Sequence, residues 1–270
     1  MSLPSLRPCF VNIMKFRKET ANLPSGDIMY LTAGHGEPLV FLHPASGVRI
    51  TPAIEGIAEA FQVYLPILPG FDGTDMLSGI ATMPDLAQLV AEFIEVTIHE
   101  RVNVAGHSFG GWVACWLAAK RPDLVGNLLL QCPAGFRPEG VGGLDGDPIA
   151  LLAKAYAHPE NRRPETKPPE VTAANRRLAS SYSADAASDY VLIDRLHEIA
   201  ANTLILHGRK DGVIPEESPQ LLERLIPSSA IAYIDDAAHN IEVDQPTEYS
   251  RLVRNFFGSR ARESVSANSA

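Results

Sequence analysis

Short apolar runs alternate along the chain with longer segments in which apolar residues recur every three to four positions. The apolar runs have the length of buried strands and cover residues 38–42, 61–68, 101–105, 125–132, 203–207 and 231–234. The periodic segments predict helices over residues 51–60, 84–98, 109–120, 219–225 and 246–257. Residues 14–33 alternate loosely around the turn Ser25-Gly26-Asp27 and predict a β-hairpin. Strands alternating with helices predict the α/β class, with a mostly parallel twisted sheet of about eight strands and helices on both faces.

One proline-rich stretch, residues 137–198, interrupts the alternation. It contains helical segments, including one that Ser188 could cap, and no convincing strand. We expect a helical cap or lid inserted between two strands of the sheet, although the same pattern fits a packing module with no catalytic role. The core domain then comprises residues 1–136 and 199–258. Residues 259–270, rich in Ser, Ala and Arg, are expected to form a disordered tail.

The most informative stretch lies around Ser108, where Gly-x-Ser-x-Gly follows a strand-like run and precedes a helix-like segment. Gly106 and Gly110 flank the serine, and small residues let a strand and a helix approach closely at a sharp turn. Such a turn lifts the hydroxyl clear of the sheet, and the amides at the start of the helix point to the same place. The motif alone is weak evidence because it also arises by chance, but its context predicts a nucleophile at Ser108.

A serine hydroxyl needs a base to act as a nucleophile, and the base is usually a histidine oriented by a carboxylate. Of the eight histidines, His239 follows the last predicted strand and so reaches the edge of the sheet where the serine turn lies. Asp211 occupies the tip of the loop after the strand at 203–207, at the same edge. Asp145 and Asp147 are alternative acids, although they lie well past the preceding strand. The preferred set follows the chain order serine, aspartate, histidine.

Four motifs, FLHPASG, GHSFGG, LHGRKDGVIP and DAAHNIEVDQP, occur in this order along the sequence. Together they resemble the α/β-hydrolase family, and the resemblance covers residues 27–257, nearly the whole chain. It implies a serine hydrolase in which Ser108 is the nucleophile, His239 the general base and acid, and Asp211 the orienting carboxylate.

The same resemblance implies an oxyanion hole built from two backbone N–H groups. One belongs to Phe109, and the other belongs to Ala45, with Ser46 as an alternative. Many relatives have His-Gly where this chain has His43-Pro44. Because proline has no N–H group, residue 44 cannot be a donor. We expect His43 to brace this loop rather than to take part in the chemistry.

Composition and charge narrow the kinds of partner. The chain has 270 residues and a formal net charge of −9, and its basic residues form no cluster, which argues against a nucleic-acid surface. No apolar run approaches the ~20 residues that span a bilayer, and residues 1–15 lack the apolar core of a signal peptide. Three cysteines without metal spacing fit a reducing cytoplasm and no disulfide framework.

A serine nucleophile points to acyl chemistry, which needs neither a metal nor an organic cofactor. The modest aromatic content of residues 137–198 predicts a small or medium acyl compound as the partner, as in a carboxylesterase or lactonase. Carbon–carbon hydrolysis of a ring-cleavage diketone, which similar enzymes perform, stays open, as do cofactor-free haloperoxidase activity, acyl transfer and a non-catalytic binding protein of the same fold. The diketone reaction needs a carboxylate-binding arginine, for which the candidates are Arg49, Arg137, Arg176 and Arg177.

Overall fold

Each of the six apolar runs of the sequence overlaps a strand of the protein, as expected for strands buried in a parallel sheet. The computed structural model describes residues 16–139, 148–164 and 167–267. The strands are β1 (Arg17–Leu23), β2 (Gly26–Ala33), β3 (Pro38–Leu42), β4 (Gln62–Pro66), β5 (Val102–His107), β6 (Val125–Gln131), β7 (Asn202–Gly208) and β8 (Ser229–Ile234). Every residue of β5 and β6 is buried, whereas β1 exposes its first four residues.

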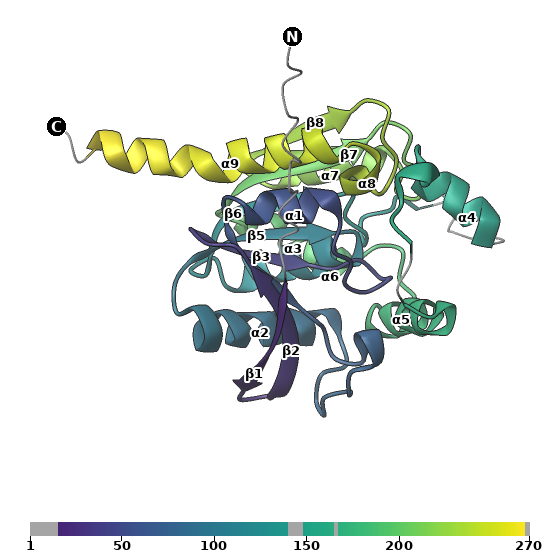
Figure 1. Ribbon diagram of the computed structural model, residues 1–270, viewed down its shortest axis with the longest axis horizontal. Coiled ribbons are helices and arrows are strands. Elements are labelled where there is room, and N and C mark those ends of the chain that lie inside the picture. Colours follow the sequence, from purple (N-terminus) through teal and green to yellow (C-terminus); the bar gives the residue numbers. More distant parts are fainter. Residues whose placement is uncertain (1–15, 140–147, 165–166, 268–270) are drawn as a thin grey trace, which may run out of the picture.

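These strands form one eight-stranded sheet with the order β1-β2-β4-β3-β5-β6-β7-β8. β2 pairs in antiparallel fashion with β1 and β4, and all the other neighbouring strands run parallel. The predicted hairpin is the β1–β2 pair. The predicted α/β class, with a mostly parallel sheet of about eight strands, is therefore confirmed (Figure 1).

Helices cover both faces of the sheet. They are α1 (Pro52–Ala58), α2 (Met83–Phe93), α3 (Phe109–Lys120), α4 (Pro148–Ala155), α5 (Pro169–Tyr182), α6 (Tyr190–Ile193), α7 (Glu217–Leu225), α8 (Ile241–Asp244) and α9 (Pro246–Ala267). Shorter turns of 3-10 or π helix cover Phe71–Gly73, Ile94–Ile98, Pro159–Asn161 and Leu196–Glu198. α1 packs against α9 on one face of the sheet, and α2 packs against α3 on the other (Figure 1).

Local sequence explains how two of these helices are placed. The Thr51 side chain accepts the N–H of Ile54, and Pro52 occupies the first position of α1. Every residue of α3 except Lys120 is buried. A helix that is apolar on all sides belongs in the interior, so α3 lies directly behind the strand that carries the serine turn.

Residues 137–198, which we call the inserted segment, connect the neighbouring strands β6 and β7. Its described parts contain α4, α5 and α6 and no strand of the sheet. The prediction that Ser188 caps a helix is wrong. Asp189 caps α6, its carboxylate accepting the N–H of Leu192 at 3.0 Å, while the Ser188 hydroxyl donates to the carbonyl of Arg137 instead.

Two predicted helix ends also differ from the structure. The helix expected over 84–98 is α-helical only to Phe93 and continues as a π turn to Ile98. The last helix was expected over 246–257, and the helical backbone of α9 reaches Ala267, whereas the disordered tail over 259–270 stays a prediction. The sequence of this added stretch contains Arg, Ala and Glu, which favour helix. Among the described helices, none has both the length and the apolar composition needed to cross a bilayer.

Candidate active site

The serine turn lies between β5 and α3, at the carboxyl end of the central strand. Ser108 has φ 53° and ψ −112°, a conformation that L-residues rarely adopt and that marks a strained position. Its N–H donates to the Gln131 carbonyl at 2.9 Å, and its own carbonyl accepts the N–H groups of Trp112 and Ala134, both at 3.1 Å. Since β6 and α3 hold the backbone from both sides, this unusual geometry is imposed by the surrounding fold.

Two glycines make this turn possible because the backbone segments around it nearly touch. A Cβ atom on Gly106 would lie 2.4 Å from the Gly110 carbonyl oxygen. One on Gly110 would lie 2.2 Å from the Leu42 carbonyl oxygen on the neighbouring strand β3. Each distance is far below van der Waals contact, so only glycine fits at either position. The small residues of the motif are therefore explained by close packing of strand, turn and helix.

Asp211 and His239 come together from two loops that are 28 residues apart in sequence. The Nδ1 atom of His239 lies 3.0 Å from Oδ2 of Asp211. The other carboxylate oxygen accepts the N–H groups of Val213 at 2.7 Å and Ile214 at 3.0 Å. Burial alone would raise the pKa of this carboxyl, but the nearby imidazole and the donated hydrogen bonds outweigh it and lower the pKa. The carboxylate therefore stays ionised and orients the ring with Nε2 free to accept a proton.

Ser108 and His239 line the same cavity, of about 560 Å³, which we call the Ser108 pocket. The predicted oxyanion donors Ala45 and Phe109 line it too, as does Ser46. In the described part of the chain, no hydrogen bond joins the serine hydroxyl to the histidine ring. Such catalytic hydrogen bonds are often long before substrate binds.

Other walls of the Ser108 pocket come from the inserted segment. Arg177, one of the four arginines considered from the sequence, does not line this pocket. The lining residues from this segment are Arg137, Leu152, Ala155, Tyr156, Arg162, Thr172, Arg176, Ala179, Ser180, Ser183, Asp185, Ala186 and Ala187. The alternative acids Asp145 and Asp147 lie outside the described residues. Ser108 and His239 therefore share this pocket with many residues of the inserted segment.

His43 braces the loop that carries the expected oxyanion donor Ala45. Its Nδ1 atom lies 2.9 Å from the Pro44 carbonyl, and its Nε2 atom accepts the Leu68 N–H at 3.2 Å. Burial lowers the pKa of this histidine to about 4. A neutral ring with its proton on Nδ1 satisfies both contacts, which fits the bracing role expected from the sequence.

The same loop is held from the other side by Asp72, which belongs to the turn after β4. Its carboxylate accepts the Val48 N–H at 2.9 Å and pairs with the Lys167 ammonium at 2.8 Å. The buried Asn175 amide of α5 donates to the same carboxylate at 2.7 Å and to the Ser46 carbonyl at 3.0 Å. The inserted segment thus helps to position the loop on which Ala45 lies.

A buried polar cluster behind His239 was not predicted from the sequence. The Gln131 amide donates to Oε2 of Glu242 at 2.5 Å and to the His239 carbonyl at 3.2 Å. Burial raises the pKa of the Glu242 carboxyl and lowers that of the His107 imidazole. The available signal was Glu242 between the apolar residues Ile241 and Val243, but only the fold shows that it lies behind the loop that carries His239.

One group of side chains could be considered for metal binding. Among the described residues, Cys132, His207 and Asp211 bring potential ligand atoms within 4.8 Å of one another. Burial strongly raises the pKa of the Cys132 thiol, whereas a metal requires the thiolate. The carboxylate already accepts two backbone N–H groups and contacts His239. We therefore assign no metal to this group.

A strand–serine–helix turn, followed by an acid and a histidine on the loops after β7 and β8, defines the class of α/β hydrolases. The family model described as "Alpha/beta hydrolase family" matches residues 33–252, and the chain belongs to this family. The resemblance inferred from the four sequence motifs is therefore confirmed.

Individual relatives are distant but extend over most of the chain. It is 25% identical to a pimeloyl-[acyl-carrier protein] methyl ester esterase of Aeromonas hydrophila, over 83% of this chain and 97% of that protein. It is 24% identical to a 2-hydroxy-6-oxo-6-phenylhexa-2,4-dienoate hydrolase of Comamonas testosteroni, over 92% of this chain and 98% of that protein. A solved meta-cleavage product hydrolase from Pseudomonas fluorescens IP01 superposes with a TM-score of 0.74 at 20% identity, covering 90% and 98% of the two chains. At that identity the superposition supports the fold alone.

Proposed function

We propose that the protein is a serine hydrolase that cleaves a small or medium acyl compound, a carboxylic ester or a lactone, through an acyl-enzyme. The observation that carries the proposal is a strained serine and an aspartate-oriented histidine at one cavity. Ser108 and His239 both line the Ser108 pocket, and Asp211 lies 3.0 Å behind the histidine. These groups are the parts that acyl transfer through serine requires.

The proposed reaction proceeds in two halves. Oγ of Ser108 attacks the carbonyl carbon while its proton passes to Nε2 of His239, and the carbonyl electron pair moves onto oxygen. The N–H groups of Phe109 and Ala45 stabilise this oxyanion, each contributing about 3 kcal/mol. Collapse of the intermediate expels the alcohol, which takes the proton from His239. Water activated by the same ring then attacks the acyl-enzyme and releases the acid.

The shape of the Ser108 pocket supports a compact and partly apolar acyl group. Its volume of about 560 Å³ lies within the range of small-molecule sites. Apolar and aromatic side chains from both the core and the inserted segment line it, among them Trp112, Phe136, Leu152, Tyr156, Val213 and Ile214. We propose on this ground that residues 137–198 act as the cap of a core comprising residues 1–136 and 199–258.

A second candidate is hydrolysis of a carbon–carbon bond in a ring-cleavage diketone. It is favoured by the four arginines that line the Ser108 pocket, Arg49, Arg137, Arg162 and Arg176, any of which could bind the carboxylate of such a substrate. Acyl transfer and cofactor-free haloperoxidase activity would use the same serine and remain alternatives. A non-catalytic binding protein would keep the pocket without the chemistry.

A labelling experiment separates these possibilities. The wild-type protein should react with a fluorophosphonate probe and hydrolyse short p-nitrophenyl esters, and Ser108→Ala should do neither. Ser180→Ala, which alters another hydroxyl of the same pocket, is the matched control and should behave as wild type. A folded wild type that neither labels nor turns over would support the binding protein. A panel of esters, lactones and dienoic diketones then ranks the hydrolase reactions by kcat/KM.

We also propose a cytoplasmic location, on the grounds of cysteine usage. The two cysteines in the described part of the chain, Cys115 and Cys132, are buried and form no disulfide. Free buried thiols are typical of proteins in reducing compartments. Fractionation of cells that produce the tagged protein tests this assignment.

A further inference from the structure

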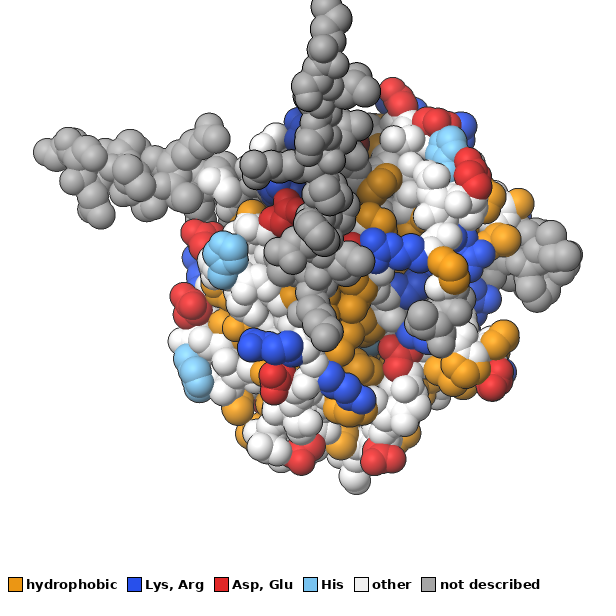
Figure 2. Space-filling model, in the orientation of Figure 1, with side chains coloured by type: hydrophobic (Ala, Val, Ile, Leu, Met, Phe, Trp, Pro, Cys, Tyr) orange, Lys and Arg blue, Asp and Glu red, His pale blue; other side chains and the backbone are white. Residues whose placement is uncertain are grey.

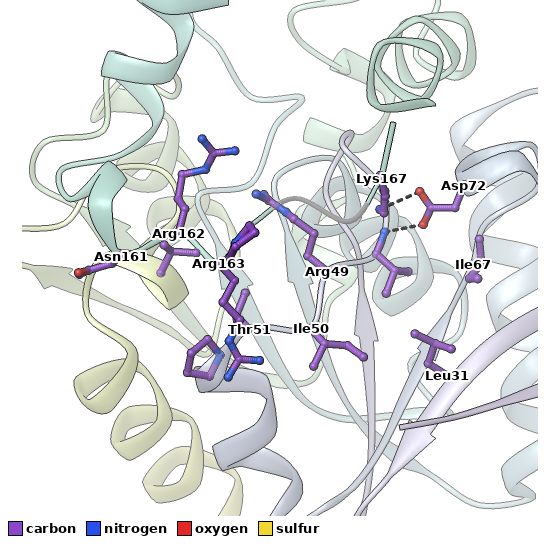
Figure 3. A pocket seen from close by; sticks show the side chains of 14 residues that line it. Leu31, Arg49, Ile50, Thr51, Ile67, Asp72, Asn161, Arg162, Arg163 and Lys167 are labelled. Carbon is purple, nitrogen blue, oxygen red and sulfur yellow. Dashed lines mark hydrogen bonds and ion pairs between the residues drawn. The ribbon is translucent and has the colours of Figure 1, made fainter. Parts of the chain in front are cut away.

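A second cavity, of about 450 Å³, lies next to the Ser108 pocket and shares Arg49 and Arg162 with it. We call it the basic pocket, because four of its lining side chains are cationic: Arg49, Arg162, Arg163 and Lys167. Its apolar walls are Leu31, Val48, Ile50, Ile67 and Val243. Figure 3 shows Arg49 between Arg162 and Arg163 on one side and the Lys167–Asp72 pair on the other.

The charge of the two pockets is opposite to that of the whole chain. Their described lining residues include six basic side chains, Arg49, Arg137, Arg162, Arg163, Arg176 and Lys167, and two acidic ones, Asp72 and Asp185. The chain as a whole carries a net charge of −9. Figure 2 shows blue side chains gathered on the side of the molecule where α4 and α5 lie in Figure 1. Such a local excess of positive charge attracts anionic ligands.

Arg163 and Lys167 both pair with carboxylates of the core. Arg163 forms a forked pair with Glu55, at 2.9 and 2.6 Å, and Lys167 pairs with Asp72 at 2.8 Å. The guanidinium of Arg162 has no carboxylate partner among the described residues. It lies over the face of the Tyr156 ring, with its Cζ atom 5.1 Å from the ring centroid. It is therefore the cation of this pocket best placed to bind an added anion.

Tyr156 connects Arg162, through Arg49, to the loop that carries His239. The buried ring of Tyr156 supports Arg162, and its hydroxyl accepts a hydrogen bond from Nη1 of Arg49 at 2.5 Å. Nη2 of Arg49 donates to the side chain of Asn240 at 2.9 Å, and Asn240 follows His239 directly. Both guanidinium groups are thus held at the boundary between the two pockets, one of them next to the histidine loop.

We propose that the basic pocket binds an oxyanion group, a carboxylate or a phosphate, at the end of the acyl compound away from the bond that Ser108 attacks. Arg162 is its main ligand, and Arg49 forms the wall that the two pockets share. A planar guanidinium can donate two parallel hydrogen bonds to such a group. The inference rests on the proposed function and narrows its substrate class to acyl compounds with a second, negatively charged end.

The test compares two p-nitrophenyl esters of equal chain length, the neutral hexanoate and the hydrogen adipate, which carries a terminal carboxylate. The wild type should hydrolyse the adipate ester with a kcat/KM about tenfold higher, since hydrogen bonds to charged groups are the strong ones. Arg162→Gln should abolish this preference, so that the two esters have equal kcat/KM values in the variant. Arg162→Lys should keep part of the preference for the adipate ester, because lysine retains the positive charge but cannot donate two parallel hydrogen bonds from one planar group.

Arg177→Gln is the matched control, since Arg177 is exposed and lines neither pocket. It should retain the wild-type preference for the adipate ester. Inhibition of hexanoate hydrolysis by free adipate and by inorganic phosphate distinguishes a carboxylate ligand from a phosphate ligand. Equal kcat/KM for both esters in the wild type, together with inhibition by neither anion, would overturn the inference. So would a preference that survives in a folded Arg162→Gln variant.

Failure of the proposed function would look different. In that case neither ester would be hydrolysed and the fluorophosphonate probe would not label Ser108. Calorimetric titration of adipate and of phosphate into the wild type and into Arg162→Gln would then decide the inference alone. Binding that the substitution weakens about tenfold supports it, and binding that is absent or unchanged contradicts it.

Discussion

Helix α3, behind the serine turn, and helix α5, in the inserted segment, are held in place by different forces. Every residue of α3 except Lys120 is buried, whereas α5 buries only Asn175, Ala179 and Tyr182. The serine turn is therefore positioned by close packing from all sides. α5 is positioned by a few directed contacts, such as the Asn175 amide on the loop near Asp72 and the Tyr182 hydroxyl on the Pro69 carbonyl at 3.1 Å.

Two further carboxylates connect the inserted segment to the rest of the chain. Asp189 accepts the indole N–H groups of Trp112 at 2.8 Å and Trp116 at 2.7 Å, which ties the end of the inserted segment to α3. Asp244 is buried and accepts backbone N–H groups on both sides of the junction. The comparison implies that substitutions should have their largest effects at the serine edge of the sheet, intermediate effects at the junction, and small effects on the surface of the inserted segment.

The largest effect is expected for Asp211→Asn, at the edge of the sheet where Ser108 and His239 lie. The amide can still accept the Val213 and Ile214 N–H groups, but it no longer stabilises the correct tautomer of His239, so kcat should fall by about 10⁴-fold. Steady-state kinetics with a p-nitrophenyl ester measures the loss. Asp235→Asn, at an exposed carboxylate paired with Arg209, should leave kcat unchanged. A full-rate Asp211→Asn enzyme would remove this aspartate from the catalytic set.

The packing argument predicts a large loss of stability in Gly110→Ala. The new methyl group would lie 2.2 Å from the Leu42 carbonyl oxygen and 2.6 Å from that of His43, both rigid backbone atoms. We expect the free energy of unfolding to fall by about 3 kcal/mol. In Gly258→Ala, whose Cβ meets open space within α9, stability should instead rise by about 0.5–1 kcal/mol. Urea denaturation of both variants compares them, and equal effects would refute the packing account.

Asp244→Asn examines the junction. The carboxylate accepts the N–H groups of Ala157 at 3.0 Å, His158 at 2.9 Å and Ala238 at 2.8 Å. Replacing one oxygen by an NH₂ group places a buried donor opposite backbone N–H groups. We therefore expect the free energy of unfolding to fall by about 2 kcal/mol. Limited proteolysis should detect earlier cleavage in the inserted segment than in the core. If unfolding free energy and cleavage order both match the wild type, the junction contributes nothing through this residue.

The smallest predicted effect concerns His158, on the exposed side of the inserted segment. Its ring contacts Asp236 at 2.7 Å and Glu160 at 3.1 Å, and these hydrogen bonds raise its pKa above the ordinary value of 6.5. A raised folded-state pKa adds stability below the unfolded-state pKa, and this stability is lost as pH rises through the folded-state pKa. His158→Gln should therefore be less stable than wild type near pH 5.5 and equally stable near pH 9.

The exposed His35, which makes no hydrogen bond or ion pair with other described residues, provides the control for this pH experiment. Thermal melts of His35→Gln should follow the wild type at both pH values. A stability difference in His158→Gln that does not change with pH would contradict the charge-based explanation.

The order of the elements and the candidate reactive residues could be predicted from the sequence because both leave local signals. The apolar runs identified the strands, and the loops after β7 and β8 carry Asp211 and His239 directly behind such runs. Less was predictable in the inserted segment, where Ser188 and Asp189 are both plausible helix caps. Asp189 is the residue that caps the helix, and its carboxylate also accepts the indole N–H groups of the two tryptophans of α3. This contact depends on residues about 75 positions away in the sequence.

The sequence by itself determined the α/β class, the family and the three residues expected to react, since these depend on short patterns and their order. Only the tertiary structure decided which arginines face a cavity, that Glu242 and Gln131 support the histidine loop, and that Arg162 lacks an acidic partner in the described part of the chain. The physical reason is that charge and hydrogen bonding act between neighbours in space. Residues that are distant in the sequence become such neighbours only when the sheet and the inserted segment have packed together.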